Sequence, residues 1–302
     1  MIDVLRAGLC DLVIDQGRPG MGSLGVPVGG AADPAALAAA NRLVGNSVEC
    51  AGLEIVLTGP ELSFPHGGTI AFTGAKFAAR RSNGEPVRWN ETVCLSAGER
   101  LMLGAAESGS RCWLAVSGGL AVPPVLGSRS TFLPSGFGGL EGRALRAGDR
   151  LVCGERHRET LSLRASPPDS LVAALRVVAG PQTEWFNDVG LAALFGTRYR
   201  VGSASDRRGI RLEGVPVARR AGELPSQGVL PGAIQVPPDG QPIMLGWDGP
   251  VTGGYPVVAT VVLADWPRLA QLRPGDPVQF VTVEVDEARA LAAGTWQIEC
   301  RE

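Results

Sequence analysis

Short apolar runs rich in β-branched residues recur along the chain, and glycine and proline punctuate them. Gly and Pro account for 42 and 23 of the 302 residues. This alternation is typical of an all-β barrel or sandwich. It predicts strands over residues 53–57, 69–73, 91–95, 100–103, 112–116, 150–153, 175–179, 199–202, 241–245, 257–263 and 278–284.

Helices are few in the same pattern. The clearest covers residues 33–44, "DPAALAAANRLV", with Asp33 as the N-cap, Pro34 at the first helical position and Gly45 with Asn46 as the stop. Further helices are predicted over residues 181–195, 266–272 and 286–293.

Four short motifs occur twice and in the same order, which argues for two tandem copies of one β unit. The pairs are "LTGPELSF" at 57 with "VAGPQTEWF" at 178, "NGEPV" at 83 with "EGVPV" at 213, "GGLAVPP" at 118 with "GAIQVPP" at 232, and "LRAGDRLV" at 145 with "LRPGDPVQ" at 272. We therefore expect a mainly β fold of two tandem barrel units. Residues 1–50 would be an N-terminal segment with one helix that packs on the first unit, which spans 51–165. A Pro/Ser linker near 165–170 would lead to the second unit, 171–302.

Charge and hydropathy exclude two classes of partner. The formal net charge of −2 and a pI near 5.9 provide no basic surface for nucleic acid. The longest apolar run, residues 257–263, is too short to cross a bilayer, and the first residues lack the pattern of a signal peptide. A cytoplasmic protein without nucleic-acid or membrane partners is expected.

Several common catalytic motifs are missing from the sequence. There is no P-loop, no GxSxG nucleophile elbow and no CxxC pair, and the chain has only two histidines. No biotin-attachment segment surrounds Lys76, so the chain is not expected to carry covalent biotin. No metal-ligand set can be identified.

Three polar clusters remain as candidates for chemistry. "GSASDRRGIRLEG", residues 202–214, contains Asp206, Arg207 and Arg211, and guanidinium groups bind carboxylate or phosphate while a neighbouring carboxylate orients them. The alternative for this cluster is a solvated hairpin edge. "DQGRPG" at 15–20 and "GVPVGGAADP" at 25–34 lead to a helix N-terminus that could receive an anion.

Two rigid loops in the second unit are the other candidates. "PSQGVLPGAIQVPPDGQP", residues 225–242, is rich in Gly and Pro and carries Gln227, Gln235, Asp239 and Gln241. "WDGPVTGGYP", residues 247–256, places Thr252 and Tyr255 on either side of two glycines, whose backbone carries no side chains. We expect both loops to form one wall of a polar pocket, with 202–214 opposite.

Ten ordered motifs over residues 11–285 resemble the KipA family, which is also called allophanate hydrolase subunit 2 or the C subunit of 5-oxoprolinase. They are "DQGRPG", "GVPVGGAADP", "NRLVGN", "LEIVLTGP", "VSGGLAVPPVLGSRST", "GGLEGRALRAGD", "GPQ", "SDRRGIRLEG", "GAIQVPPDGQPI" and "TGGYPVVATV". The resemblance implies one carboxyltransferase-type module built from cyclophilin-like β-barrels. Two positions depart from the family: relatives usually carry glutamate where Gln227 stands, and methionine is common at Arg208.

The resemblance also implies function and partners. It predicts one subunit of an ATP-dependent 5-oxoprolinase that activates the lactam amide for hydrolysis to glutamate, with ATP and magnesium in the complex. Its partners would be a KipI-type subunit, which is the B subunit of 5-oxoprolinase, and a LamB/YcsF-type subunit, which is the A subunit. Two alternatives stay open: the carboxyltransferase half of a biotin-dependent urea or amide carboxylase, and a non-catalytic regulatory partner of a KipI-type protein.

Both chemistries require fixed donors and acceptors around a small amide, and a group that stabilises an anion. On this reading Arg207 and Arg211, with Asp206, stabilise the anion. Amide recognition falls to Gln182, Gln235 and Asp239. Thr252, Gly253, Gly254 and Tyr255 provide close backbone contact.

Overall fold

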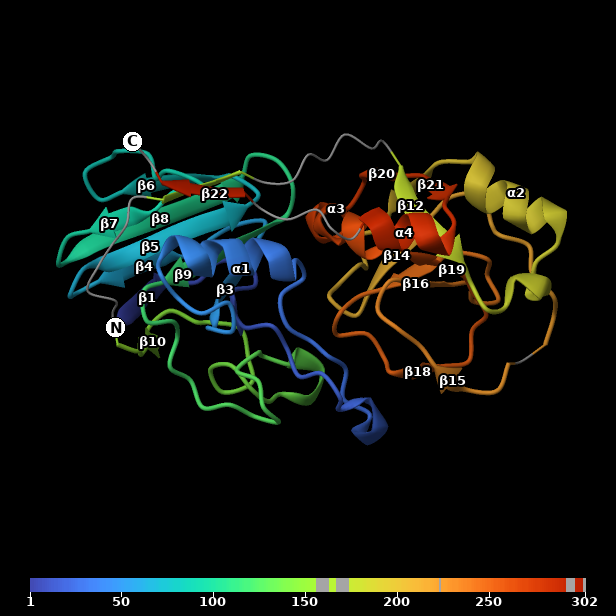
Figure 1. Cartoon of the computed structure of the whole chain (residues 1–302), viewed down its shortest axis with the longest axis horizontal. Helices are drawn as coiled ribbons and strands as arrows, with labels where there is room; N and C mark the ends of the chain where they lie inside the picture. The colour runs from blue at the N-terminus through green and yellow to red at the C-terminus, as the bar shows by residue number, and fades with distance from the viewer. Residues whose placement is uncertain (156–162, 167–173, 223, 292–296, 301–302) are drawn as a thin grey trace. The chain divides into compact units, whose positions relative to one another are not determined.

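The computed structural model describes residues 1–155, 163–166, 174–222, 224–291 and 297–300. The chain divides into two compact units (Figure 1). Unit 1 comprises residues 1–18, 29–168 and 295–302, and unit 2 comprises residues 19–28 and 169–294. The predicted linker near 165–170 lies mostly outside the described residues.

Unit 1 is built from two five-stranded antiparallel sheets. The first has the order β10-β1-β4-β8-β6 and the second β2-β3-β9-β5-β7, while β11 pairs separately with β22. The bounds are β1 Ile2–Arg6, β2 Leu12–Ile14, β3 Gly52–Val56, β4 Glu61–Phe64, β5 Gly68–Gly74, β6 Phe77–Arg81, β7 Val93–Leu95, β8 Glu99–Ala106, β9 Arg111–Val116, β10 Arg150–Leu151, β11 Leu163–Ser166 and β22 Gln297–Cys300. Inward-facing aliphatic and aromatic side chains of both sheets form one buried core.

The predicted N-terminal helix is confirmed as α1 (Pro34–Leu43), which packs against β5 and β9. The Asp33 carboxylate accepts a hydrogen bond from Ala36 N at 3.0 Å, as an N-cap does. On the face toward the sheet, the Thr73 hydroxyl donates to Ala36 O at 2.8 Å. The helix start predicted to receive an anion is thus capped by the chain's own carboxylate.

The first residues of the "DQGRPG" motif join two segments of unit 1 by hydrogen bonds. The Asp15 carboxylate accepts hydrogen bonds from the hydroxyls of Ser128 and Ser130, both at 2.6 Å. Arg18, 1% exposed, donates to Ser130 O and lies 5.0 Å from the centre of the Phe137 ring. These contacts fix the loop that follows β9.

Unit 2 is a nearly closed barrel. Its eight-stranded sheet has the order β20-β13-β14-β17-β16-β19-β12-β21. The bounds are β12 Leu175–Ala179, β13 Tyr199–Val201, β14 Gly209–Glu213, β16 Ala233–Gln235, β17 Ile243–Leu245, β19 Val257–Val261, β20 Pro277–Val278 and β21 Phe280–Thr282. The two edge strands, β20 and β21, are consecutive in the chain, so a single segment joins both edges of the sheet and leaves almost no free edge.

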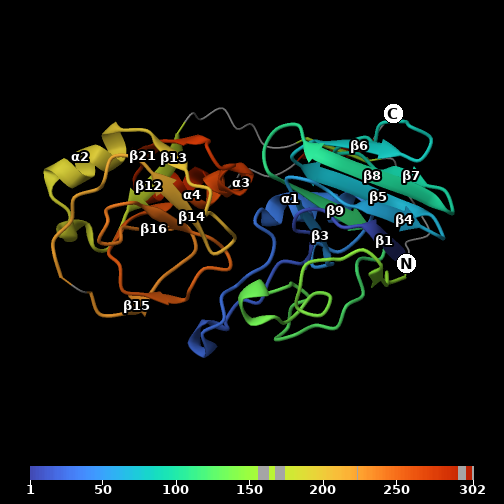
Figure 2. The same ribbon diagram turned by 180° about the vertical axis from the view of Figure 1, so that it is seen from behind.

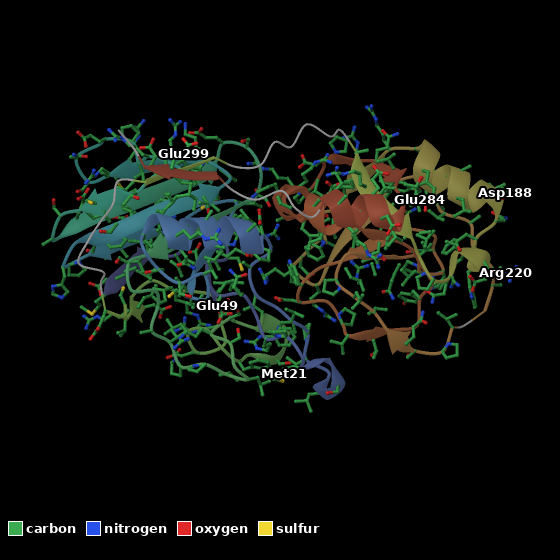
Figure 3. All side chains as sticks on the ribbon, viewed as in Figure 1. Met21, Glu49, Asp188, Arg220, Glu284 and Glu299 are labelled. Atoms are coloured by element: carbon green, nitrogen blue, oxygen red, sulfur yellow. The ribbon has the colours of Figure 1, made fainter. Side chains whose placement is uncertain are left out.

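The helices of unit 2 are short. They are α2 (Asp188–Gly196), α3 (Trp266–Gln271) and α4 (Val285–Leu291). The helix predicted over 181–195 is wrong at its start, because residues 183–185 form a 3-10 turn and the Asn187 side chain caps α2 by accepting from Gly190 N at 2.9 Å. In Figure 3, Asp188 is the first residue of α2. Arg220, also labelled there, lies on a loop, and its backbone N–H donates to Trp185 O. The end of the predicted helix 286–293 lies outside the described residues.

The sequence repeat has a structural counterpart in the two Gly-Asp turns. Gly148 and Gly275 have φ of 92° and 91°, and each donates its N–H at 2.8 Å to a carbonyl of β1 or β13, respectively. Asp149 and Asp276, which follow them, each accept from the backbone N–H three residues earlier, at 2.7 and 2.8 Å. The turn leads into β10 in one unit and β20 in the other. β1 therefore pairs with β10 as β13 pairs with β20.

The predicted fold class, mainly β with few helices, is confirmed, because the described residues contain twenty-two strands and four α-helices. No helix within the described ranges is long and apolar enough to cross a membrane.

Candidate functional site

A two-stranded ribbon in unit 2 joins the two loops that the sequence singled out. β15 (Gln227–Gly228) pairs with β18 (Thr252–Gly253), with Gln227 opposite Gly253. Figures 1 and 2 show this ribbon set apart from the eight-stranded sheet of the same unit. Val229, which follows β15, packs against Ala233, Leu245 and Val257 of the sheet. The barrel thereby fixes the position of a ribbon with little apolar surface of its own.

Three glutamine side chains gather at this ribbon. Gln182, 8% exposed, accepts from Val257 N at 3.0 Å through Oε1 and donates through Nε2 to Gln227 Oε1 at 3.1 Å. Gln235, 4% exposed, donates through Nε2 to Tyr255 O at 3.3 Å. Buried primary amides each offer a donor and an acceptor, so the cluster presents the groups that an amide ligand would pair with.

Gly253 makes the close approach of these side chains possible. A Cβ at this position would lie 2.5 Å from Gln235 Nε2, which is closer than non-bonded atoms come. The glycine thus serves the packing of a side chain rather than a left-handed turn. Thr252 and Tyr255, on either side of Gly253 and Gly254, are exposed, and Tyr255 is 43% exposed. Predicted residues Gln182, Gln235 and 252–255 are therefore brought together.

Arg207 occupies a different environment from the one predicted. Its guanidinium forms a bidentate pair with Asp248, with Nε to Oδ2 at 2.8 Å and Nη2 to Oδ1 at 3.2 Å. The two side chains are 8% and 1% exposed. Backbone hydrogen bonds from Gly246 N to Arg208 O and from Asp248 N to Arg207 O join the same two loops. The Arg207 charge is already compensated, so its role here is to join loop 246–249 to loop 206–208.

The two predicted aspartates shape turns. Asp206 Oδ1 accepts from the backbone N–H groups of Arg208 and Gly209, at 2.8 and 3.1 Å. Asp239 Oδ1 accepts from Gln241 N at 3.0 Å, and the Gln241 side chain in turn bonds both backbone polar groups of Gly214. Such contacts are Asx-type turns.

Arg211 is an exposed cation of this region. It lies on β14, and its backbone N–H donates to Ser205 Oγ at 3.0 Å. In the part of unit 2 that the structure describes, no carboxylate pairs with its guanidinium. Of the two predicted anion-stabilising arginines, Arg211 is the one available to a ligand.

Gln227 is the member of the glutamine cluster that was not assigned a role from sequence. It shares the rigid loop with Gln235, and the only signal in its favour was its departure from the glutamate usual in relatives. Its Nε2 atom is buried, and no hydrogen-bond partner for it exists among the described residues.

Comparison with known proteins identifies the family. The model of the carboxyltransferase domain, subdomains A and B, matches residues 24–282. The chain is 40% identical to the C subunit of 5-oxoprolinase from Escherichia coli, covering 95% of this chain and 93% of that protein. It is 32% identical to urea amidolyase of Lachancea kluyveri, covering 91% of this chain but 16% of that much longer protein.

Solved structures agree with this result. TTHA0988 superposes with a TM-score of 0.81 at 35% identity, covering 93% of this chain and 55% of that one. The urea amidolyase of K. lactis gives a TM-score of 0.85 at 30% identity, covering 95% of this chain and 19% of that one. The chain thus belongs to the carboxyltransferase-domain family, subdomains A and B, that includes the C subunits of 5-oxoprolinase.

Proposed function

We propose that the chain is the C subunit of an ATP-dependent 5-oxoprolinase, and that it takes part in activating the lactam amide of 5-oxoproline for hydrolysis to glutamate. The observation that carries the proposal is the buried glutamine cluster at the β15–β18 ribbon. Gln235 of this cluster, on β16, and the exposed Arg211, on β14, both pair with Ile243 of the strand between them. The similarity to the E. coli protein over nearly the full length of both chains supports it.

The proposed chemistry divides into recognition and charge stabilisation. A lactam offers one carbonyl acceptor and one N–H donor, and fixed primary amides complement both. Negative charge that develops on the amide oxygen during activation is stabilised by a cation, and we assign this role to Arg211.

ATP and magnesium belong to the complex in this proposal. ATP supplies the phosphoryl group that makes an amide carbon electrophilic. Among the described residues no three His, Cys, Asp or Glu side chains gather as a metal site. Magnesium in such chemistry is commonly held by one or two carboxylates together with the nucleotide phosphates. The partners we propose are a KipI-type subunit, the B subunit of the enzyme, with a LamB/YcsF-type subunit, the A subunit, in the cytoplasm.

Arg211→Ala is expected to lower the rate of 5-oxoproline-dependent ATP hydrolysis by the reconstituted complex about tenfold, or about 1.4 kcal/mol. The reason is the loss of an exposed cation whose position on β14 pairs with Ile243, as does Gln235 of the amide cluster. Arg289→Ala is the matched control, because Arg289 is an exposed arginine of α4 paired only with Asp286 at 3.3 Å. Unchanged turnover in Arg211→Ala would remove Arg211 from the mechanism.

A second function is favoured by one specific observation, the match of this chain to the urea amidolyases. In that case the chain is the carboxyltransferase half of a biotin-dependent urea or amide carboxylase. A third candidate is a regulatory partner of a KipI-type protein without turnover. Assay of the complex with 5-oxoproline, and separately with urea and a biotinylated carrier, distinguishes the three. ATP hydrolysis that 5-oxoproline fails to stimulate would refute the first.

A further inference from the structure

The helix α2 of unit 2 has no polar side chain after its first residue. Asp188 is followed by "VGLAALFG", residues 189–196, which complete the helix. A helix on the surface of a globular protein normally presents polar side chains to solvent, and one that is apolar on all sides is normally buried. Figures 1 and 2 show α2 along the outside of its unit. Its composition is therefore that of a helix covered on both faces.

The inner face of α2 is already packed on the barrel. Leu194 is fully buried, and Leu191 and Phe195 are half-buried against the core of unit 2. Gly190 lets the helix approach a neighbouring loop, because a Cβ there would lie 2.1 Å from Ala218 O. These contacts fix the rotation of α2 about its own axis. The helix cannot bury its other face by turning.

The outer face of α2 is apolar and exposed. With 3.6 residues per turn, the side away from the barrel consists of Val189, Ala192, Ala193 and Gly196. Val189 is 70% exposed, and Val215 beside the helix is 51% exposed. Val215 borders this face because the Tyr199 hydroxyl lies 2.9 Å from Val215 O and 3.3 Å from Ala193 O. We call these four helical residues, with Val215, the α2 face.

Opposite charges stand at the two ends of the α2 face. Asp188 is the first residue of the helix, and Arg198 lies two positions beyond its last residue, Gly196. Both residues are exposed, and neither forms an ion pair with another described residue. The helix has nine residues, so its ends lie roughly 13 Å apart.

We propose that the α2 face packs against the α2 face of a second copy of this chain, with the two helices antiparallel. A two-fold axis near Ala192 and Ala193 brings Asp188 of each copy to Arg198 of the other, so both ends gain an opposite charge. No side chain of the helical face is larger than valine, which lets two helices approach closely. The charge pattern is complementary to itself under this rotation, and that selects a second copy as the occupant.

The first test is sedimentation velocity of the full chain over about a hundredfold range of concentration. The face is small, so we expect a weak dimer whose fraction rises with concentration. Val189→Glu would bury an unpaired charge twice in each dimer, and we expect it to raise the Kd of the dimer at least about tenfold. Leu263→Glu is the matched control, because Leu263 is 59% exposed in a 3-10 turn that leads into α3. In Figure 1, α3 and α2 lie at opposite ends of unit 2, and the control is expected to keep the wild-type Kd.

Reversal of the charges identifies the occupant. Asp188→Arg alone, or Arg198→Asp alone, sets like charges against each other twice in the dimer, and each is expected to raise the Kd about tenfold. The double variant restores both pairs, and we expect its Kd to return to within about threefold of the wild-type value. A different protein bound to this face would keep its own charges, so the double variant would not restore its binding.

Three results would overturn the proposal. They are a wild type that stays monomeric throughout the concentration range, a dimer that Val189→Glu leaves intact, and a double variant no tighter than the single ones. If the wild type is monomeric and Val189→Glu weakens binding of a partner subunit instead, the face belongs to that subunit and a second copy is the wrong occupant.

Folding of the variants is checked by the urea unfolding midpoint. It is expected to match wild type, because Val189, Asp188 and Arg198 are exposed. If Val189→Glu fails this check, Ala192→Glu on the same face replaces it. The outcome leaves the proposed reaction untouched, since no residue of the α2 face belongs to the candidate site.

Discussion

Asp248→Ala is expected to lower the free energy of unfolding by about 3–5 kcal/mol, the cost of removing one partner of a buried ion pair. The substitution removes the carboxylate that pairs bidentately with the Arg207 guanidinium, whose side chain is 8% exposed. The substitution also loosens loop 246–249, whose Trp247 ring lies 4.3 Å from that of Trp266. Urea unfolding followed by tryptophan fluorescence measures the change.

Asp286→Ala is the matched control for this prediction, because it breaks an Asp–Arg pair whose side chains are 95% and 76% exposed. We expect a loss below about 0.5 kcal/mol there. Replacing both members of the buried pair, Arg207→Met with Asp248→Leu, should restore most of the stability, since no charge stays buried. A loss under about 1 kcal/mol in Asp248→Ala would contradict a strong contribution of this pair to stability.

Asp33→Asn is expected to stabilise the protein by about 3 kcal/mol above pH 7 and by only about 0.5 kcal/mol at pH 4. Burial, with a smaller contribution from nearby Glu54, raises the pKa of Asp33 to about 6 from 3.8. Between these values the folded protein holds a proton that the unfolded chain has released. Wild-type stability therefore falls as the pH rises from about 4 to about 6.

Asparagine removes this cost and keeps the cap, because its side-chain oxygen can still accept from Ala36 N. Denaturant unfolding of wild type and Asp33→Asn at pH 4, 5, 6 and 8 tests the prediction, and the measurement at pH 4 is its internal control. Parallel stability curves across this range would contradict a raised pKa. Asp11, whose pKa burial also raises to about 6, adds to the wild-type slope but not to the difference between the variants.

The parts of the fold that could be predicted from sequence are those with local chemistry. Asp33 and Pro34 define the start of α1 within four residues, and the Gly-Asp turns at 148 and 275 carry their own hydrogen bonds. The strands that sequence missed are either very short, as β15 and β18 are, or interrupted by polar residues, as β6 and β14 are. Their pairing comes from partners far along the chain, which no local pattern records.

In the candidate site too, sequence predicted local features better than contacts between distant residues. Gln182 and Gln235 were predicted and meet at the ribbon, although 53 positions separate them in the sequence. Arg207 was predicted to stabilise an anion, because its partner Asp248 lies 41 residues away and only the folded barrel joins them. The residue types of the site could be predicted from the sequence, but their hydrogen-bond partners could not.

The division of the chain between the units has a consequence for synthesis. The chain passes from one unit to the other after residues 18, 28, 168 and 294, and the strand that pairs with β11 is β22, near the C-terminus. During translation, β11 emerges from the ribosome well before β22 is made, and most of unit 2 is synthesised in between. Completion of unit 1 is therefore a late event of biogenesis. Until β22 has been made, the edge of β11 that pairs with it stays open. A chaperone that shields this edge would raise the yield of native protein.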